Sequence, residues 1–253
     1  MRIATWNVLH RIHAENWRET VPDVFPDEAV RIAAITARIE ALLADDDVVC
    51  LQEVSGDQLA SLRTALPAMQ VCAFIYPRVP SLKQPGPSPL QHPEEALVTI
   101  ASRARLVAGA AFPNDPGKGF VVVDVDGVLI VNTHLSAGDR RTVQLQHIRA
   151  HVDHSASHSA DQRSAVVVCG DCNTSSAKVL AALDVGFELV NLGLDALPTR
   201  PRPDLPDRSS DKPAAIDHIF VRGLVAEGGV VVDVDGTSDH NLVRATVREP
   251  SAA

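Results

Sequence analysis

The sequence has few aromatic residues and no long apolar run, and each shortage excludes a class of protein. Only 4% of its 253 residues are aromatic, which speaks against an extended platform for stacking nucleobases. A membrane-spanning helix needs about 18 consecutive apolar residues, and no apolar stretch of the sequence is that long. The N-terminus MRIATWNVLH has no charged region followed by a long apolar stretch, so no secretory signal is expected. We therefore predict a cytoplasmic protein that does not enter a membrane.

The chain also lacks a surplus of positive charge. Its 23 basic and 32 acidic residues give a formal net charge of −9, which excludes attachment to nucleic acid by bulk charge. This balance still allows a few cations, or a bound metal, to hold a phosphate locally. Arginine outnumbers lysine by 19 to 4. The guanidinium fork suits phosphate and carboxylate recognition, although codon bias in a GC-rich genome accounts for the same excess.

Cysteines are too few and too scattered for a disulfide framework. The four are Cys50, Cys72, Cys169 and Cys172, which fits reduced thiols in the cytoplasm. Cys169 and Cys172 have the spacing of a redox pair, but the surrounding thioredoxin-like pattern is missing. We interpret Cys169 instead as the buried end of a strand.

What is present is an ordinary globular composition, with 45% hydrophobic and 22% charged residues. Helical spacing of apolar residues predicts helices over Asp27–Leu43 and Arg140–Val152, and Ser55 with Gln58 forms a capping box for another. A two-residue turn at Asp126-Gly127 predicts a hairpin. Strands are expected at Arg2–Val8, Val48–Leu51, Met69–Tyr76, Leu97–Ala101, Phe120–Val125, Val128–Thr133, Ala165–Cys169, Ile216–Val221, Val230–Val234 and Leu242–Val247. This order predicts an α/β protein with mixed sheets and helices outside.

Two proline-rich segments interrupt the pattern, at residues 77–95 and 198–213. Either could be a linker between domains. Strand-like runs continue at similar spacing on both sides, so we interpret both segments as long surface loops on one scaffold. The expected organisation is a single domain over residues 1–248 with a tail at 249–253.

Polar residues follow the ends of the apolar strands. They are Asn7, Glu53, His134, Asp171, Asn173, Asp217, His218, Asp239 and His240. In layered α/β proteins such strand ends converge on one site. Hard oxygen donors without a cysteine set favour magnesium, manganese or calcium over zinc. Asp171 and Asn173, two residues apart in an extended segment, face the same side.

Six short motifs, in this order, resemble those of the endonuclease/exonuclease/phosphatase superfamily with its DNase I-like fold. They are Thr5-Trp6-Asn7, Leu51-Gln52-Glu53-Val54, Asn132-Thr133-His134-Leu135, Gly170-Asp171-Cys172-Asn173, Ile216-Asp217-His218-Ile219 and Ser238-Asp239-His240. Each motif alone is weak, but all six beside apolar strands are specific. The resemblance implies a four-layer α/β sandwich of two packed mixed β-sheets flanked by helices. It also implies hydrolysis of phosphodiesters or phosphomonoesters with a divalent metal.

The resemblance further implies a role for each matching residue. Glu53 is the principal carboxylate for Mg²⁺ or Mn²⁺, with Asn7 and Asp239 beside it. Asp171 positions or deprotonates the attacking water, and Asn173 holds that water or the phosphate. His240, oriented by Asp217, binds the scissile phosphate, and His134 is a second phosphate-binding or general-acid histidine. Family members often carry a phosphate-contacting tyrosine in mid-chain, for which Tyr76 is the candidate here.

Other polar residues are weaker candidates. The second proline segment carries Arg200 and Arg202, either of which could grip the substrate phosphate, or simply belong to a mixed-charge surface loop. His10, with Arg11 and His13, follows Asn7 closely enough to line the same cleft. Four histidines at helical spacing form either a zinc site or a solvated face: His147, His151, His154 and His158.

The sequence thus predicts a divalent-metal-dependent phosphoester hydrolase, specifically a phosphodiesterase or nuclease. A phosphatase for a small phosphorylated metabolite is the alternative within the same chemistry. A binding module that keeps the fold without catalysis is the alternative from another class. The expected partner is the phosphoester substrate, including nucleic acid held by local contacts, and the expected state is a monomer.

Overall fold

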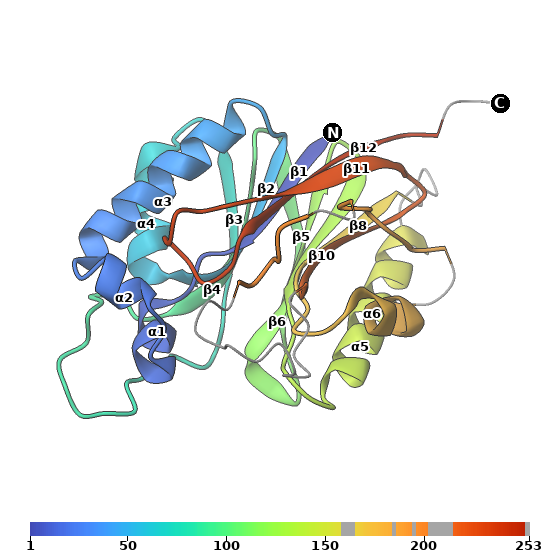
Figure 1. Cartoon of the computed structure of the whole chain (residues 1–253). Helices are drawn as coiled ribbons and strands as arrows, with labels where there is room; N and C mark the ends of the chain where they lie inside the picture. The colour runs from blue at the N-terminus through green and yellow to red at the C-terminus, as the bar shows by residue number, and fades with distance from the viewer. Residues whose placement is uncertain (158–164, 184–185, 194–195, 202–214, 251–253) are drawn as a thin grey trace.

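The protein is a sandwich of two six-stranded mixed sheets with helices on both outer faces (Figure 1). The computed structural model describes all residues except 158–164, 184–185, 194–195, 202–214 and 251–253. The first sheet has the order β11-β12-β1-β2-β4-β3 and the second the order β5-β6-β7-β8-β10-β9. This confirms the predicted four-layer α/β architecture.

The first sheet and its helices come mainly from the N-terminal half of the chain. The strands are β1 (Arg2–Asn7), β2 (Val48–Ser55), β3 (Gln70–Ile75) and β4 (Glu95–Ala101), joined by the C-terminal β11 (Val225–Val232) and β12 (Leu242–Arg248). The helices are α1 (Arg11–Trp17), α2 (Val21–Val24), α3 (Glu28–Leu43) and α4 (Gly56–Ala65). The two ends of the chain therefore meet in one sheet, where β1 pairs with β12.

The second sheet is built from the middle of the chain. Its strands are β5 (Ala104–Phe112), β6 (Asp115–Val125), β7 (Val128–His134), β8 (Val166–Asp171), β9 (Glu188–Leu189) and β10 (Asp217–Arg222). Its outer face is covered by α5 (Arg141–Ser157) and α6 (Ser176–Leu183) (Figure 1). None of the described helices is long and apolar enough to cross a membrane.

Three apolar layers hold the sandwich together. Between the sheets lie small and branched side chains such as Ile3, Val121 and Val167. The outer layers pack Trp6 against the α3 side and Phe120 against the α5 side. Burial of this kind supplies most of the free energy of folding.

Hydrogen bonds between buried amide side chains and backbone, called here the polar tie, cross the apolar layer between the two sheets. Asn132 on β7 donates its amide hydrogens to the backbone oxygens of Leu51 at 3.0 Å and Val98 at 2.9 Å, in the opposite sheet. Gln52 Nε2 in turn donates to Asn132 Oδ1 at 2.8 Å. Because buried amides are costly unless paired, this tie fixes how the two sheets register against each other.

Strand direction brings the polar strand ends to one edge of the sandwich. The parallel pairs β1–β2 and β7–β8 end there, while β10 and β12 begin there. Register across the second sheet sets His134 opposite Asp171, and Asp171 opposite Asp217. Three residues far apart in sequence thus form a row on adjacent strands.

The sequence predicted most elements, and its errors have local causes. Ser55 caps α4 by accepting a hydrogen bond from Gln58 N at 3.1 Å, but the Gln58 amide donates to Thr36 Oγ1, so only half of the predicted capping box forms. β11 starts at Val225 rather than Val230, because a bulge between Ala226 and Gly228 interrupts the apolar pattern. The elements α1, α2, β5, α6 and β9 were not predicted.

Two alternative interpretations, a redox pair and a histidine metal site, find no support in this arrangement. Cys169 and Cys172 are both buried and free. His147 and His151 pack against Phe120, with ring centroids 5.8 and 4.9 Å away. Among the described residues neither histidine joins a group with metal-ligand spacing, and His158 lies outside the described residues.

Candidate active site

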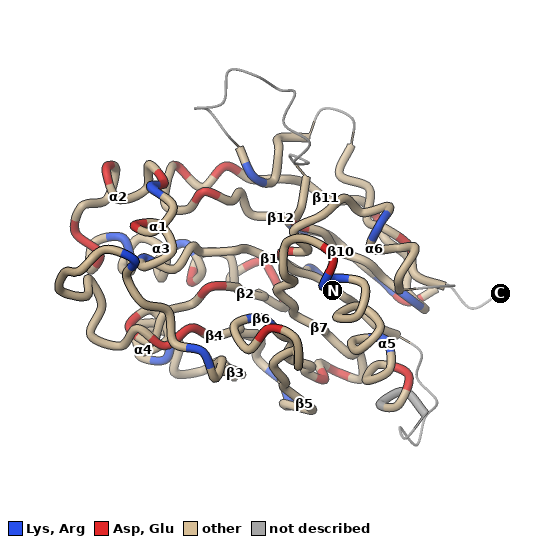
Figure 2. Tube along the Cα trace, turned by 90° about the horizontal axis from the view of Figure 1, so that it is seen from below, with Lys and Arg blue, Asp and Glu red and all other residues tan. Residues whose placement is uncertain are grey.

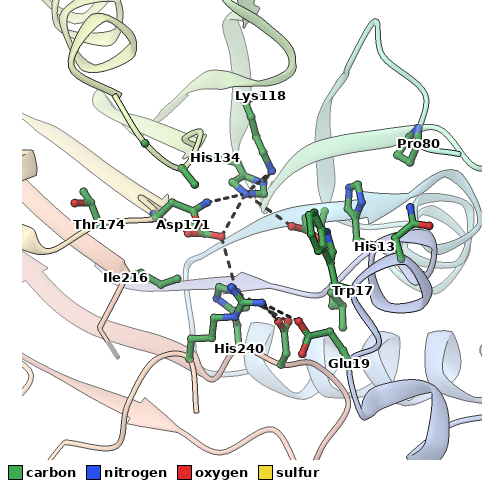
Figure 3. Close-up of a pocket in the computed structure, with 18 of the residues that line it drawn as sticks. His13, Trp17, Glu19, Pro80, Lys118, His134, Asp171, Thr174, Ile216 and His240 are labelled. Atoms are coloured by element: carbon green, nitrogen blue, oxygen red, sulfur yellow. Dashed lines mark hydrogen bonds and ion pairs between the residues drawn. The ribbon is translucent and has the colours of Figure 1, made fainter. Parts of the chain in front are cut away.

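A pocket of about 1090 Å³ opens at the edge where both sheets deliver their polar strand ends. Its floor carries Glu53, His134, Asp171 and His240, and Figure 3 shows His134, Asp171 and His240 pointing toward one another. The walls come from α1, the loop between β3 and β4, and the segments after β7 and β8.

Glu53 is turned into the pocket by an unusual backbone. Its φ is +57°, in the left-handed region, at a register shift between β2 and β4. Its carboxylate accepts hydrogen bonds from Asn7 Nδ2 at 3.2 Å and from His10 N at 3.1 Å. Burial works to raise the pKa of Glu53, but the nearby charges of His13 and Lys118 help to hold it well below its ordinary value. Glu53 is therefore anionic at neutral pH.

Asn7 bridges two carboxylates from different sheets. Its Nδ2 donates to Glu53 at 3.2 Å and to Asp171 Oδ2 at 3.1 Å, while its Oδ1 accepts from Leu9 N at 2.9 Å. The bond from Leu9 fixes the orientation of the amide, so Asn7 presents its nitrogen, not its oxygen, to the centre of the site.

Asp171 lies at the centre of the floor. His134 Nε2 is 3.3 Å from its Oδ2, and Asn173 N donates to its Oδ1 at 2.9 Å. Burial acts to raise the pKa of Asp171, yet the adjacent His134, His240 and Lys118 lower it to a value below its usual range. Lys118 Nζ lies 2.6 Å from His134 Nε2, which adds a cation to this side of the floor.

His240 and Asp217 form a buried hydrogen-bonded pair, in which burial raises the pKa of Asp217 above its ordinary value. His240 Nδ1 lies 2.9 Å from Asp217 Oδ2, and its Nε2 lies 3.9 Å from Asp171 Oδ2. Burial alone would lower the pKa of His240, but the carboxylates of Asp217, Asp239 and Asp171 raise it to about 10. The imidazole is thus a cation at neutral pH, with its Nδ1 committed to Asp217 and its Nε2 on the pocket side.

Asp239 has one oxygen that accepts a hydrogen bond and one, Oδ1, that lies 3.9 Å from His240 Nε2. Arg200 Nη2 donates to its Oδ2 at 2.6 Å and also contacts Glu19 Oε1 at 3.1 Å. Asp239 Oδ1 is buried without a hydrogen-bond partner among the described residues. Asp239 Oδ1 thus faces the charged imidazole of His240 and keeps acceptor capacity for a divalent cation.

Three groups of side chains have their ligand atoms within 4.8 Å of one another: Glu53 with His134 and Asp171, Asp171 with Asp217 and His240, and His13 with Glu53 and Glu95. Asp239 belongs to none of these groups within the described residues. The donors that face the pocket are nevertheless mainly carboxylate oxygens, which suit a hard divalent cation.

Not every candidate residue reaches the pocket. His10 is fully buried, where its Nδ1 caps α1 and its Nε2 lies 3.2 Å from the Pro93 oxygen. Tyr76 is 2% exposed and lies in the core between the sheets. Arg200 lines the pocket, whereas Arg202 lies outside the described residues.

The sequence pattern missed Lys118 and the pair of His13 with Glu95. His13 Nε2 lies 2.9 Å from the buried Glu95 Oε2. Lys118 precedes Gly119, which the hairpin register sets opposite His134, but the predicted strand began at Phe120 and so left Lys118 out. Glu95 had no such signal, since its place beside α1 depends on how the loop before β4 folds back.

Solved structures of similar fold are spread over different phosphoester chemistries. A Bacteroides vulgatus endonuclease/exonuclease/phosphatase has 17% identity and a TM-score of 0.65, covering 98% of each chain. Danio rerio TDP2 in complex with a single-strand DNA product has 16% identity and a TM-score of 0.62, again covering 98% of each chain. A Bacteroides thetaiotaomicron mannosyl-6-phosphatase has 14% identity and a TM-score of 0.64, covering 98% of this chain and 99% of its own. No curated protein matches the sequence.

The sandwich and its polar edge define the class of this protein as a phosphoester hydrolase with a DNase I-like fold. The chain belongs to the Endonuclease/Exonuclease/phosphatase family, whose model matches residues 4–240. The family is one of phosphoester hydrolases, so the protein is classed as an enzyme.

Proposed function

We propose that this protein is a Mg²⁺- or Mn²⁺-dependent phosphodiesterase that attacks the scissile phosphate with an activated water. The observation that carries this proposal is the single floor that joins Glu53, Asp171 and the His240–Asp217 pair. It combines an anionic centre for a divalent cation with a protonated imidazole for phosphate.

Glu53 and Asp239 are the residues proposed to hold the metal. Glu53 is kept anionic, and Asp239 Oδ1 has no hydrogen-bond partner among the described residues. Asn7 acts in this proposal through its amide nitrogen, which sets the position of Glu53 relative to Asp171. When bound, a divalent cation supplies charge stabilisation to the phosphoryl oxygens as the transition state develops.

Asp171 and Asn173 are proposed to handle the water. A carboxylate held anionic accepts a hydrogen bond from water and takes its proton as the new bond to phosphorus forms. Asn173 also has a left-handed backbone, with a φ of +51°, and its Nδ2 donates to Leu135 O at 2.9 Å. This places its amide beside His134 Nε2, at 3.4 Å, on the phosphate side of the floor.

His240 is proposed to bind the phosphate as a cation, with Asp217 orienting it through Nδ1. His134, beside Lys118, is proposed as a second phosphate-binding group. Preorganised donors of this kind stabilise negative charge that develops during phosphoryl transfer. Arg200 is proposed as a further phosphate contact. Its guanidinium already pairs with Asp239 and Glu19, so the phosphate would share the guanidinium with these two carboxylates.

Hydrolysis of a small phosphomonoester is the second candidate function. The similar fold of a mannosyl-6-phosphatase supports it, while the similar fold of TDP2 bound to a DNA product supports the diester. Three of the chain's 4 lysines line the pocket: Lys83, Lys118 and Lys178. This placement favours a nucleic acid strand with several phosphates over a small phosphomonoester.

The test is release of nitrophenol from bis(4-nitrophenyl) phosphate and 4-nitrophenyl phosphate, with Mg²⁺, with Mn²⁺ and with EDTA. We expect metal-dependent turnover that is faster for the diester and is abolished by EDTA. Glu53→Gln and Asp171→Asn should each lower kcat by about 10³-fold or more. Glu40→Gln, at an exposed position of α3, is the matched control and should leave kcat unchanged. Turnover that is equal in EDTA would contradict the proposal.

Metal binding has a readout that does not depend on turnover. A cation that binds only the folded protein raises its stability by about 2.7 kcal/mol at 100 times its dissociation constant. For a chain of this size that corresponds to a rise in Tm of about 5–10 °C. Saturating Mg²⁺ or Mn²⁺ should therefore raise Tm, and Glu53→Gln should remove most of the rise. An unchanged Tm at saturating metal would exclude a tight resident site.

A further inference from the structure

Trp17 stands apart from every other aromatic side chain that the structure describes. Its exposed fraction is 65%, and it is the only aromatic residue among the exposed large hydrophobic residues of the described chain. The other tryptophan, Trp6, is fully buried. Trp17 also lines the pocket that contains Glu53, Asp171 and His240 (Figure 3). An indole left open to water at this position has no role in the core.

The placement of Trp17 follows from how α1 begins. His10 N donates to Glu53 Oε2, so the start of α1 is anchored at the floor of the pocket. At about 1.5 Å per residue, Trp17 lies roughly 10 Å along the helix from that anchor. Helical side chains lean toward the N-terminus of their helix, which brings the indole back toward the floor. The ring thus lies on the wall that α1 contributes to the pocket.

The ring is part of a small assembly with the proline-rich loop between β3 and β4. Asn16 Nδ2 donates to Ser81 O at 2.9 Å, and Asn16 Oδ1 accepts from Lys83 N at 2.8 Å. These two bonds hold the loop against α1 and set Lys83 Nζ 3.6 Å from the centroid of the Trp17 ring. A ring covered by Lys83 on one face reaches 65% exposure only if its other face is open.

An open aromatic face beside a cation in the pocket favours a ligand that has both a flat ring and a phosphate. Nucleobases stack on tryptophan, and the adjacent phosphates pair with lysine. A sugar phosphate has a charge for Lys83 but offers Trp17 only the C–H groups of a puckered ring, which make less contact than a flat base. The combination therefore favours a nucleotide over a phosphorylated sugar as the ligand of this pocket.

We infer that Trp17 and Lys83 form a nucleoside subsite, in which the base next to the scissile phosphate stacks on the open face of Trp17. The inference rests on the proposed function only for the position of the scissile phosphate. It specifies the substrate class as a nucleotide ester or the end of a nucleic acid strand.

Intrinsic fluorescence tests the subsite without any turnover, because Trp17 and Trp6 are the only tryptophans. The Asp171→Asn variant in Mg²⁺ is titrated with a five-residue oligothymidylate and, separately, with glucose 6-phosphate. We expect saturable quenching by the oligonucleotide and none by the sugar phosphate. In a Trp17→Phe background the quenching should vanish, because Trp6 is buried. Equal quenching by both ligands, or no quenching by the oligonucleotide, would overturn the inference.

The affinity for an oligonucleotide shows whether a base stacks on Trp17 or only lies near it. With a labelled oligothymidylate followed by anisotropy, Trp17→Ala should weaken binding about tenfold, whereas Trp17→Phe, which keeps a ring, should stay within about twofold. Lys83→Gln should weaken binding and make it less dependent on salt, while Arg103→Gln, at an exposed residue paired with Asp126, should do neither. Unchanged affinity in Trp17→Ala would overturn the subsite. Quenching without turnover of any substrate would instead leave the subsite standing and reject the proposed hydrolysis.

Discussion

At the scale of residues, the candidate site depends on which atom of each side chain faces the pocket. Asp217 commits the Nδ1 of His240 and keeps the ring charged, which leaves Nε2 on the pocket side. Asn7 turns its amide nitrogen toward Glu53 and Asp171. The family resemblance named all five of these residues and implied that Asp217 orients His240, but only the contacts show that Asn7 acts as a donor to two carboxylates.

Replacing Asp217 by Asn tests the role of the buried pair. The variant removes the first of the carboxylates that raise the pKa of His240 and weakens control over its tautomer. We expect kcat to fall by about 10²- to 10⁴-fold with little change in KM. Steady-state kinetics measure this, and Asp153→Asn on α5 is the control, because that exposed carboxylate pairs with Arg222 far from the floor. A small loss, equal to that of the control, would show that Asp217 has no role in turnover.

The substitution Asn7→Asp distinguishes an amide donor from a metal ligand. If Asn7 served mainly as an oxygen ligand, a carboxylate would preserve or strengthen metal binding. If Asn7 is instead a donor to two anions, the enzyme should not tolerate the substitution, because a carboxylate at this position would face Glu53 and Asp171 with like charge. Losing hydrogen bonds to charged groups costs about 1.5–3 kcal/mol, so we expect kcat to fall by roughly 10- to 150-fold in steady-state assays. Retained activity with tighter metal binding would favour the ligand role.

At the scale of elements, the site depends on the close approach of β7 and β8. Gly170 has a φ of +138°, and a Cβ at this position would lie 1.9 Å from Thr133 O. β8, which ends at Asp171, can therefore pair with β7, which ends at His134, only because residue 170 has no side chain.

Gly170→Ala should force these two strands apart. We expect a loss of about 3 kcal/mol in the free energy of unfolding, from backbone strain together with overpacking. Urea denaturation followed by circular dichroism measures the change. Gly86→Ala is the matched control, because a Cβ there has nothing within 4 Å, and it should be nearly neutral. Equal stability of the two variants would contradict the strained approach.

At the scale of the whole molecule, the charge of the pocket differs from that of the chain. Figure 2 shows acidic and basic residues interspersed along the trace. The lining of the pocket nevertheless contains six lysine and arginine side chains, besides the charged His240, and four carboxylates among the described residues: Arg78, Lys83, Lys118, Arg141, Lys178 and Arg200 against Glu19, Glu53, Asp171 and Asp239. A net charge of −9 therefore does not prevent the pocket from accepting a phosphate.

Acid should destabilise the molecule through its paired carboxylates. Burial opposes ionisation of Asp115, but hydrogen bonds from Ser136 and Gly117 and the charge of Arg78 lower its pKa below 3.8. A group with a lowered pKa in the folded state contributes stability above its unfolded value, and that stability is lost as pH falls through the folded value. We expect the free energy of unfolding to decline below about pH 4, as measured by urea titrations between pH 3 and pH 7. Asp115→Asn should flatten the decline, and an unchanged slope would contradict this assignment.

Features of the fold and site that depend on local sequence pattern could be predicted from the sequence, and features that depend on contacts between distant residues could not. Alternating apolar residues and the Asp126-Gly127 turn indicated the strands, because local patterns reflect which face is buried. The six motifs indicated the family and most of the floor. Short or alanine-rich elements such as α1 and β5 gave no periodic signal, and their form depends on what they pack against.

The sequence by itself determined the class of fold and the chemical character of the site, because periodicity and residue type are local properties. Only the tertiary structure decided how these residues act together. It sets Lys118 beside His134 and leaves Asp239 Oδ1 without a hydrogen-bond partner among the described residues. It also buries His10 and Tyr76 away from the pocket. It also leaves Trp17 open beside Lys83. Those relations join residues distant along the chain, so strand register and loop packing, rather than local pattern, determine them.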